Sequence, residues 1–388
     1  MRRIVLAGAL VAVLVGGLAA CGKKGDPGAG GGPGDPNQGL GNAPTQSPAG
    51  GGAPGPGGPG GGASPTPTGG GGGGGNPTPP PLLANKSGYV WASQSGAASY
   101  SATGNYWFNS SGGGITITRT STGSYTVRFE GLGDSGGIAH AQAYGNTANF
   151  CTVFNWLKNG ANEDVRVKCY AANTTEADTQ FVASFTVGSQ GGANISYLWA
   201  DRAGTPGKYT PDGDYRYDTT GNASTVERVA AGKYRVYVPA SVDTPDPETF
   251  QVTAYGPVTI HCKMGVIGVA AGTHEVHCRD ATGALFDARF ALTYATAGSM
   301  IGRGDRRFGN FTRTSDGVTS GAVGVYLVPA PELGQNRGQV VVTAVGATTA
   351  YCHTGGWGAS GTTLNMTVRC YGPGGVAVNS DFNLGVTW

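Results

Sequence analysis

Charged residues are scarce in this chain of 388 residues: Asp, Glu, Lys and Arg together account for 12%, and the net charge is +2. No extended basic tract occurs at any point. Phosphate backbones and anionic headgroups bind proteins mainly through clustered Lys and Arg, so a near-neutral chain offers them little. The composition therefore argues against nucleic acid as a partner.

Long apolar runs are also missing, with one exception at the start of the chain. There the basic pair Arg2-Arg3 is followed by an apolar run from Ile4 to Ala20. A basic region, an apolar region and small residues at its end are typical of a secretory signal peptide. The run is close to the shortest length that can span a membrane, so an uncleaved anchor is the alternative. Removal of residues 1–20 leaves 23 basic and 23 acidic residues.

The apolar run ends in Leu18-Ala19-Ala20-Cys21, which resembles the lipobox of bacterial lipoproteins. The resemblance implies that residues 1–20 are a lipoprotein signal peptide and that Cys21 is acylated. Each buried CH₂ of an acyl chain contributes about 0.8 kcal/mol to membrane binding. We therefore expect a cell-envelope protein anchored in a membrane, and Gly22 favours the outer membrane or cell surface. An ordinary signal peptide with a chance cysteine is the alternative.

A Gly/Pro-rich segment follows Cys21 and extends to residue 85 without apolar periodicity. Such a segment cannot bury enough apolar surface to offset the entropy of an ordered chain, so we expect a disordered tether. Its Pro-rich part, Pro77–Pro81, favours extended polyproline II. A flexible chain of this length averages roughly 45 Å end to end and can stretch to roughly 200 Å. It could hold a folded part away from a membrane.

Seven cysteines are present, so one is left over if the others pair. If Cys21 carries lipid, the other six form pairs separated by 18, 16 and 18 residues: Cys151/Cys169, Cys262/Cys278 and Cys352/Cys370. A signal peptide implies an oxidising compartment, in which paired cysteines are interpreted as disulfides. Each bridge would stabilise the fold by roughly 3 kcal/mol in the chain-entropy account. We expect both cysteines of a pair to point into a core.

Other residues recur at fixed distances from these cysteines. Seven residues before each first cysteine, between an Ala and a Gly, lie Tyr144, Tyr255 and Val345. Five residues after it lie Trp156, Ile267 and Trp357. Twelve residues after each second cysteine lie Phe181, Phe290 and Phe382. These coincidences define internal repeats: repeat 1 (86–190), repeat 2 (191–297) and repeat 3 (298–388).

Apolar and polar residues alternate within each repeat, as in Val165-Arg166-Val167-Lys168-Cys169. Short alternating segments between Gly, Asn, Asp and Ser clusters, without an amphipathic helix, predict an all-β chain of three tandem antiparallel β-sandwich (immunoglobulin-like) repeats. The linkers, 187–195 and 294–300, are short, so we expect abutting domains in a rod. The repeats resemble the Cys-paired all-β repeats of uncharacterised secreted lipoproteins of high-GC bacteria. That resemblance implies architecture and location but no activity.

The histidines are the first candidates for chemistry. His274-Glu275-Val276-His277 looks like a zinc-protease motif, but that motif needs two histidines four apart on one helical face. Here they are three apart on a predicted strand and point to opposite faces. His261 and His277 each precede a cysteine, so we expect both to point outward, where a pair could bind a transition metal weakly. The simpler interpretation is surface filler, because Phe150 and Lys168 occupy these positions in repeat 1, and we expect no cofactor.

Other polar motifs have structural interpretations. Asp212-Gly213-Asp214 with Asp218 loosely resembles a calcium loop but lacks the remaining ligands, so we expect a solvated turn. Arg303-Gly304-Asp305 spells the integrin-binding tripeptide, which we attribute to chance. A further set recurs nine residues after each second cysteine and is expected to form hydrogen bonds at a turn: Asp178, Asp287 and Asn379.

Aromatic residues give the best hint of a binding surface. Tyr106-Trp107-Phe108 places three aromatics in succession, so at least one faces outward if the segment is a strand. Exposed rings suit sugar stacking or protein contact, while packing between sheets or domains is the alternative. We expect Trp156 and Trp357 to pack near the disulfides. Four tyrosines extend the set: Tyr215, Tyr217, Tyr234 and Tyr237.

The first hypothesis is a non-catalytic cell-envelope lipoprotein that projects a rod of disulfide-stabilised sandwiches for adhesion or structural contact. Its expected partners are the membrane, through the lipid, and a cell-surface glycan or protein. The second hypothesis is a glycan- or small-ligand-binding surface module. The third and weakest is a secreted hydrolase, because no distinctive polar constellation stands out among the repeats.

Overall fold

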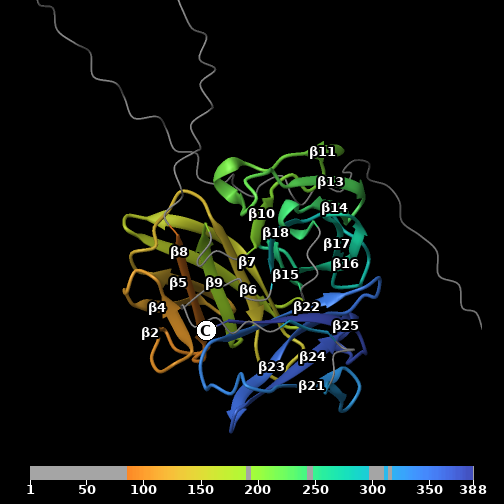
Figure 1. Cartoon of the computed structure of the whole chain (residues 1–388). Coiled ribbons are helices and arrows are strands. Elements are labelled where there is room, and N and C mark those ends of the chain that lie inside the picture. The colour runs from red at the N-terminus through yellow and green to blue at the C-terminus, as the bar shows by residue number, and fades with distance from the viewer. Residues whose placement is uncertain (1–84, 189–193, 243–247, 297–309, 313–316, 388) are drawn as a thin grey trace, which may run out of the picture. The chain divides into compact units, whose positions relative to one another are not determined.

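The computed structural model describes residues 85–188, 194–242, 248–296, 310–312 and 317–387 (Figure 1). All of these belong to one compact unit of the chain. The predicted signal sequence, Cys21, the predicted tether and Arg303-Gly304-Asp305 lie outside the described residues. No helix within the described ranges is long and apolar enough to cross a membrane.

The all-β prediction is confirmed, because the described residues form 25 strands and no α-helix. Three short 3₁₀ turns interrupt the strands: η1 (Gly213–Tyr215), η2 (Pro239–Ser241) and η3 (Pro373–Gly375).

Repeat 1 contains two antiparallel sheets, which we call its inner and outer sheets. The inner sheet has the order β3-β1-β9-β6. The outer sheet, β2-β4-β5-β8-β7, continues through β7 into the inner strands of repeat 2, so that the two form one nine-stranded sheet. The strands are β1 (Lys86–Ala92), β2 (Ser99–Ser101), β3 (Trp107–Asn109), β4 (Ile115–Ser121), β5 (Ser124–Phe129), β6 (Ile138–Ala143), β7 (Phe150–Asn159), β8 (Asn162–Tyr170) and β9 (Phe181–Val187).

Repeat 2 has the same plan, with the inner order β12-β10-β18-β15 and the outer order β11-β13-β14-β17-β16. Its strands are β10 (Ile195–Ala200), β11 (Gly207–Tyr209), β12 (Arg216–Asp218), β13 (Thr225–Ala230), β14 (Lys233–Tyr237), β15 (Glu248–Tyr255), β16 (Ile260–Ala270), β17 (Thr273–Asp280) and β18 (Arg289–Thr296).

Repeat 3 has a shorter front part, with the inner order β22-β25-β19 and the outer order β20-β21-β24-β23. Its strands are β19 (Asn310–Thr312), β20 (Thr319–Ser320), β21 (Val325–Ala330), β22 (Gln339–Val345), β23 (Tyr351–Ser360), β24 (Thr363–Tyr371) and β25 (Asp381–Thr387).

A core lies between the two sheets of each repeat and draws apolar residues from both, and the core of repeat 1 also includes Tyr197, Trp199 and Tyr255 of repeat 2. In the outer sheet the alternation works as the sequence predicts: Val165, Val167 and Cys169 are buried, while Arg166 is exposed. The three phenylalanines at the equivalent position of the last strand are all buried in these cores: Phe181, Phe290 and Phe382.

Three backbone contacts join the repeats through equivalent positions. In each contact, the residue seven positions before the first cysteine of one repeat pairs in parallel with a residue of another repeat. That partner lies two positions after the first cysteine of its own repeat. The pairs are Tyr255 with Val153, Val345 with Met264, and Tyr144 with Thr354. The following glycine donates its N–H to the same carbonyl each time, from Gly256 to Val153 (2.8 Å), Gly346 to Met264 (3.0 Å) and Gly145 to Thr354 (3.0 Å). These glycines have φ of 99–114°, which explains why the sequence motif requires glycine.

The contacts therefore close a ring, because repeat 1 touches both repeat 2 and repeat 3. In the rod expected from the short linkers, repeats 1 and 3 would not touch. The structure differs from that expectation, because Tyr144 of repeat 1 pairs with Thr354 of repeat 3. The physical reason is the free edge of each inner sheet. An unpaired edge exposes backbone N–H and C=O groups, and here each edge strand meets the outer sheet of a neighbouring repeat.

Candidate functional site

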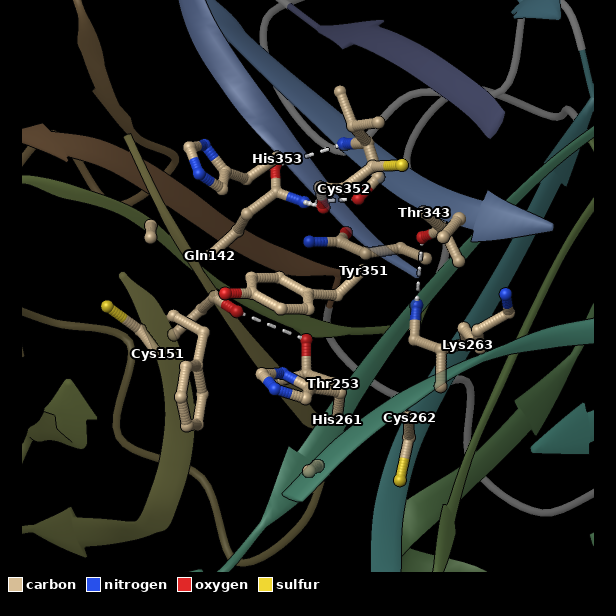
Figure 2. Close-up of a pocket in the computed structure, with 18 of the residues that line it drawn as sticks. Gln142, Cys151, Thr253, His261, Cys262, Lys263, Thr343, Tyr351, Cys352 and His353 are labelled. Carbon is tan, nitrogen blue, oxygen red and sulfur yellow. Dashed lines mark hydrogen bonds between the residues drawn. The ribbon is translucent and has the colours of Figure 1, made fainter. Parts of the chain in front are cut away.

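A central cavity of about 60 Å³ lies where the three repeats meet (Figure 2). That volume holds roughly four water molecules. Each repeat contributes the end of its inner edge strand and the residues around its first cysteine, including Gln142, Gln251, Thr343, Lys263 and His353. The three first cysteines line it, but their sulfur atoms point away from its centre.

Three aromatic rings converge beside this cavity, one from each repeat. They are Phe150, His261 and Tyr351, and each immediately precedes a first cysteine. The centroid of the His261 ring lies 4.0 Å from that of Phe150 and 4.0 Å from that of Tyr351, on which it stacks with an interplanar angle of 6°. We call this set the aromatic plug. Its rings pack on one another beside the cavity, in the space that solvent would otherwise occupy.

His261 was expected to point outward into solvent as ordinary surface filler, with a weak metal pair as the alternative. The outward placement is wrong, because the ring is half-buried and packs between Phe150 and Tyr351 of the neighbouring repeats. Burial in the plug lowers the pKa of His261 to about 3, so the ring is neutral at physiological pH. The error arose because the side of the strand opposite the core is covered by the neighbouring repeats. That face lies inside the junction and not in water.

His277 is buried and does not face His261 directly. In the register of the two strands, His261 lies opposite Arg279 and His277 lies opposite Lys263. The His277 Nε2 lies 3.3 Å from a carboxylate oxygen of Glu275, and burial lowers its pKa. Within the described ranges, no three His, Cys, Asp or Glu side chains gather closely enough to hold a metal ion.

Polar side chains next to the first cysteines tie the repeats together. Lys263 Nζ donates to Thr348 O (2.9 Å) in repeat 3, and burial lowers its pKa to about 8. The equivalent His353 places its Nε2 2.9 Å from Thr147 O in repeat 1. Residues at the same position therefore bind the same loop carbonyl of the neighbouring repeat, which indicates a structural role for both.

The outward faces of the inner sheets are polar and yet buried. His140 is 1% exposed and lies between Thr253 Oγ1 (3.0 Å) and Thr293 Oγ1 (2.8 Å) of repeat 2. Burial lowers the pKa of His140 to about 3. Gln142 exchanges two hydrogen bonds with the backbone of Val342 in repeat 3. These polar groups have protein partners, so their burial is tolerated.

The three disulfides bridge neighbouring strands of the outer sheets: Cys151–Cys169, Cys262–Cys278 and Cys352–Cys370. In each pair the two cysteines lie directly opposite one another and are buried. A thiolate role needs access and activation; these sulfurs are bonded and in the core.

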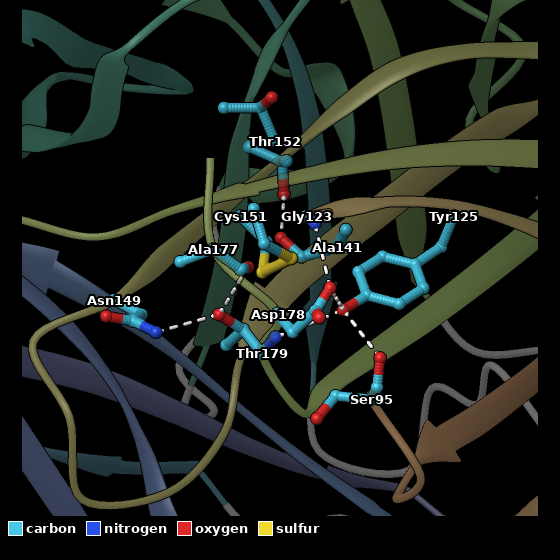
Figure 3. The surroundings of a disulfide bond; sticks show 12 residues. Ser95, Gly123, Tyr125, Ala141, Asn149, Cys151, Thr152, Ala177, Asp178 and Thr179 are labelled. Atoms are coloured by element: carbon cyan, nitrogen blue, oxygen red, sulfur yellow. Dashed lines mark hydrogen bonds between the residues drawn. A yellow bond between two sulfur atoms is a disulfide. The ribbon is translucent and has the colours of Figure 1, made fainter. Parts of the chain in front are cut away.

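A recurrent hydrogen-bonded tie surrounds each disulfide (Figure 3). In repeat 1, Tyr125 Oη donates to Asp178 Oδ1 (3.1 Å), which also accepts the N–H of Gly123 (2.9 Å). Gly123 has φ of 66° and accepts from the Cys169 N–H through its own carbonyl. The equivalent acceptors in the other repeats are Asp287, bonded to Tyr234, and Asn379, bonded to Tyr326. The predicted turn role of these residues matches this geometry.

Two clusters of four aromatic rings fill two of the junctions. Trp156 of repeat 1 packs on Trp199 (5.8 Å between centroids), Tyr215 (5.9 Å) and Tyr255 (5.4 Å) of repeat 2. The matching cluster joins Trp357 of repeat 3 to Trp91, Tyr106 and Tyr144 of repeat 1. Both tryptophans were expected to pack near the disulfides, and their role at the junctions was not predicted. Their spacing from the inter-repeat glycine motif was the available signal.

The other aromatic candidates differ in how far they are buried and in what they contact. Tyr234 is 1% exposed and belongs to a core, so the prediction that it could face outward is wrong. Tyr217 stacks on Tyr197, and Phe108 packs on Tyr89. Tyr237 is half-buried and lies near Lys208. Trp107 is half-buried and packs against the core of repeat 1.

The acidic candidates form turns. Asp212 Oδ1 accepts the N–H of Asp214 (2.9 Å) at the start of η1. Asp218 is 8% exposed and accepts the N–H groups of Thr220 (2.9 Å) and Ala240 (3.0 Å). Asp218 is therefore buried rather than solvated as the sequence analysis expected, and its oxygens are used by the backbone.

Sequence reasoning also missed one pattern. Gly133-Asp134-Ser135-Gly136-Gly137 fits the Gly-x-Ser-x-Gly spacing of hydrolase nucleophiles. Ser135 lies exposed in the loop between β5 and β6, and the Asp134 carboxylate pairs with Lys86 (3.0 Å). Among the described residues no histidine bonds to Ser135 as a base, and the loop leads into a strand and not a helix. The spacing therefore lacks the geometry that activates a serine.

The polar side chains of the site therefore bind groups of neighbouring repeats. Burial lowers the pKa of His140 and His261, so both rings are neutral at physiological pH. Comparison of the chain with protein-family models, with curated proteins and with solved structures found no match.

Proposed function

We propose that this protein is a non-catalytic, lipid-anchored envelope protein that presents a rigid β body for contact at the cell surface. The observation that carries the proposal is the use of its chemically capable side chains. His140, Lys263 and His353 are buried and bind groups of a neighbouring repeat. Side chains used in this way stabilise a scaffold and are not free to transfer protons to a substrate.

The anchor half of the proposal rests on the sequence resemblance at Leu18-Ala19-Ala20-Cys21. A Gly/Pro-rich tether would hold the β body away from the membrane, and three internal disulfides suit an oxidising exterior. The closed contacts between repeats would keep the presented surface rigid.

The test is a Cys21→Ser variant expressed beside the unchanged chain in a lipoprotein-processing bacterium. The proposal expects acyl labelling and membrane retention only for the unchanged chain. Protease treatment of intact cells should release a resistant fragment that begins near residue 86, because the tether offers unprotected backbone. Retention of Cys21→Ser in membranes without acyl label, or protection of the tether on intact cells, would contradict the proposal.

A further inference from the structure

Lys86, Asp134 and Glu163 meet where the first strand of repeat 1 touches the loop between β5 and β6. The Lys86 Nζ lies 3.0 Å from Asp134 Oδ2 and donates to Gly133 O (2.7 Å). Asp134 is held in turn, because its N–H donates to Glu163 Oε2 (3.2 Å) and its Oδ1 accepts the N–H of Gly136 (3.3 Å). An amine and a carboxyl group are therefore kept in contact by fixed neighbours.

Glu163 is the unusual member of this group. It is 0% exposed, and its Oε1 is buried without a hydrogen-bond partner among the residues that the structure describes. The pKa of Glu163 is raised to about 8, chiefly by burial; the charges of Asp134 and Asp164 add to the rise, and that of Lys86 opposes it. From repeat 2, Tyr215 also lies close enough for the charge of Glu163 to raise its pKa. A protonated carboxyl group therefore lies beside the ion pair at physiological pH.

The fold does not require a carboxyl group at this position. Glu163 pairs with Phe129 in the register of β5 and β8, as Leu364 pairs with Ala330 in repeat 3. Both Glu163 and Leu364 lie six residues before a second cysteine. Leu364 is fully buried in the core of repeat 3, so an apolar side chain fills the position without the cost of burying an acid. The comparison points to a chemical use of Glu163.

We propose that Lys86 and Asp134 condense to an isopeptide bond with the assistance of Glu163. The ion pair already holds every atom of the products. Nζ forms a bond to Cγ of Asp134, the bond from Cγ to one Oδ breaks, and that oxygen leaves as water with two of the three ammonium protons. Glu163 relays one of these protons, because it gives its own to the leaving oxygen and takes one from Nζ. Groups held in contact react as if at about 10⁵–10⁸ M, which favours the amide.

The bond joins the first strand of the inner sheet to the loop that follows β5 of the outer sheet. Lys86 is the first residue of β1, so force transmitted by the predicted tether would enter the fold at this residue. A covalent bond there resists the peeling of β1 from its sheet. This mechanical benefit rests on the proposed anchoring, whereas the bond itself does not.

The first test is peptide mass spectrometry of the full chain, purified in detergent, denatured, reduced and digested with trypsin. We expect a branched peptide that joins Lys86 to Asp134, with a mass one water molecule below the sum of its two parts. Lys86→Arg keeps a cation beside Asp134 but removes the amine, so the branched peptide should disappear. Lys168, which pairs with Glu176 elsewhere in repeat 1, is the internal control and should stay free.

The second test isolates Glu163. The full chain carrying Cys21→Ser is refolded from inclusion bodies, and the branched peptide is followed over time. Glu163→Gln should slow its formation by about a hundredfold or more, and Glu163→Leu, which introduces the residue of repeat 3, should do the same. With Glu163 present, the rate should fall as the pH rises above about 8, where the acid loses its proton. A purely structural role would not produce that profile, and thermal unfolding establishes that each variant is folded.

A folded, unchanged chain whose peptides carry Lys86 and Asp134 as free side chains overturns the proposal and leaves an ion pair only. Formation at an unchanged rate in folded Glu163→Gln and Glu163→Leu also overturns it, as does an equal yield of a branched peptide at Lys168 and Glu176. Acyl labelling of Cys21 is read on a different peptide, so failure of the isopeptide bond and failure of the proposed anchoring are distinguished.

Discussion

The three junctions between repeats have equivalent backbone contacts but different side chains. At the junctions of repeats 1 and 2 and of repeats 3 and 1, four aromatic rings fill the space around Trp156 and Trp357. At the junction of repeats 2 and 3, the equivalent residues are Ile267 and Val345.

The junction without rings gains cationic donors instead. Lys263 and Arg279 of repeat 2 both donate to backbone carbonyls of repeat 3. One backbone geometry is therefore stabilised in two ways, by ring packing or by charge-assisted hydrogen bonds. The backbone contact therefore recurs at all three junctions, while the side chains around it differ.

The largest expected effect is at the aromatic junction. Trp156→Ala should lower the free energy of unfolding by about 3–5 kcal/mol, because Trp156 is 5% exposed and contacts three rings. Ile267→Ala, the matched change at the junction without rings, removes a half-buried side chain and should cost about 1–2 kcal/mol. Denaturant unfolding measures both. Equal losses would mean that the two junctions do not differ as described.

The cationic junction is the next to test. Lys263→Met should cost about 2 kcal/mol, because Thr348 O and its hydroxyl lose a charged donor. Lys158→Met, at an exposed lysine of repeat 1, should change stability by less than about 0.5 kcal/mol. A Lys263→Met protein as stable as the unchanged chain would argue that the ammonium contributes nothing to the junction.

Acid should weaken the contacts that depend on neutral histidines. Burial lowers the pKa of His140 and His261 to about 3 from the ordinary value of 6.5. The unfolded chain therefore binds protons first, so stability is complete above pH 6.5 and falls as the pH drops towards 3.

Each such histidine contributes a slope of up to about 1.4 kcal/mol per pH unit. Urea unfolding between pH 7.5 and 4.5 measures the slope. His140→Asn should reduce the number of protons taken up on unfolding by about one. A flat profile over this range would contradict the burial of neutral rings between repeats.

The smallest effect concerns the tie around each disulfide. Tyr125→Phe removes the bond to Asp178, and Tyr326→Phe removes the weaker bond to Asn379. We expect a loss of about 1 kcal/mol in repeat 1 and less in repeat 3, where an amide replaces the carboxylate. Thermal unfolding compares the two, and a larger loss in repeat 3 would reverse this ranking.

The sequence predicted the strands and the cysteine pairs because both depend on local spacing. Alternation at Val165, Val167 and Cys169 correctly identified a core face. The inner sheets do not follow the same rule. His140 and Gln142 lie on a polar face that alternation alone would place in water, yet that face meets other repeats.

The ring of repeats could not be predicted for a related reason. It depends on which sheet edges meet, and an edge contact such as Tyr144 with Thr354 joins residues more than two hundred positions apart. The sequence marked these contacts through the glycine that follows each such residue. Gly145, Gly256 and Gly346 all adopt a positive φ in the structure, which favours glycine.

Amide hydrogen exchange can show whether repeat 1 closes the ring against repeat 3. The N–H groups of Gly145, Gly256 and Gly346 each donate to a carbonyl of another repeat. Exchange followed by NMR should find all three protected to a similar degree. Protection of Gly256 and Gly346 with rapid exchange at Gly145 would contradict the closed ring, because that is the pattern of an open rod.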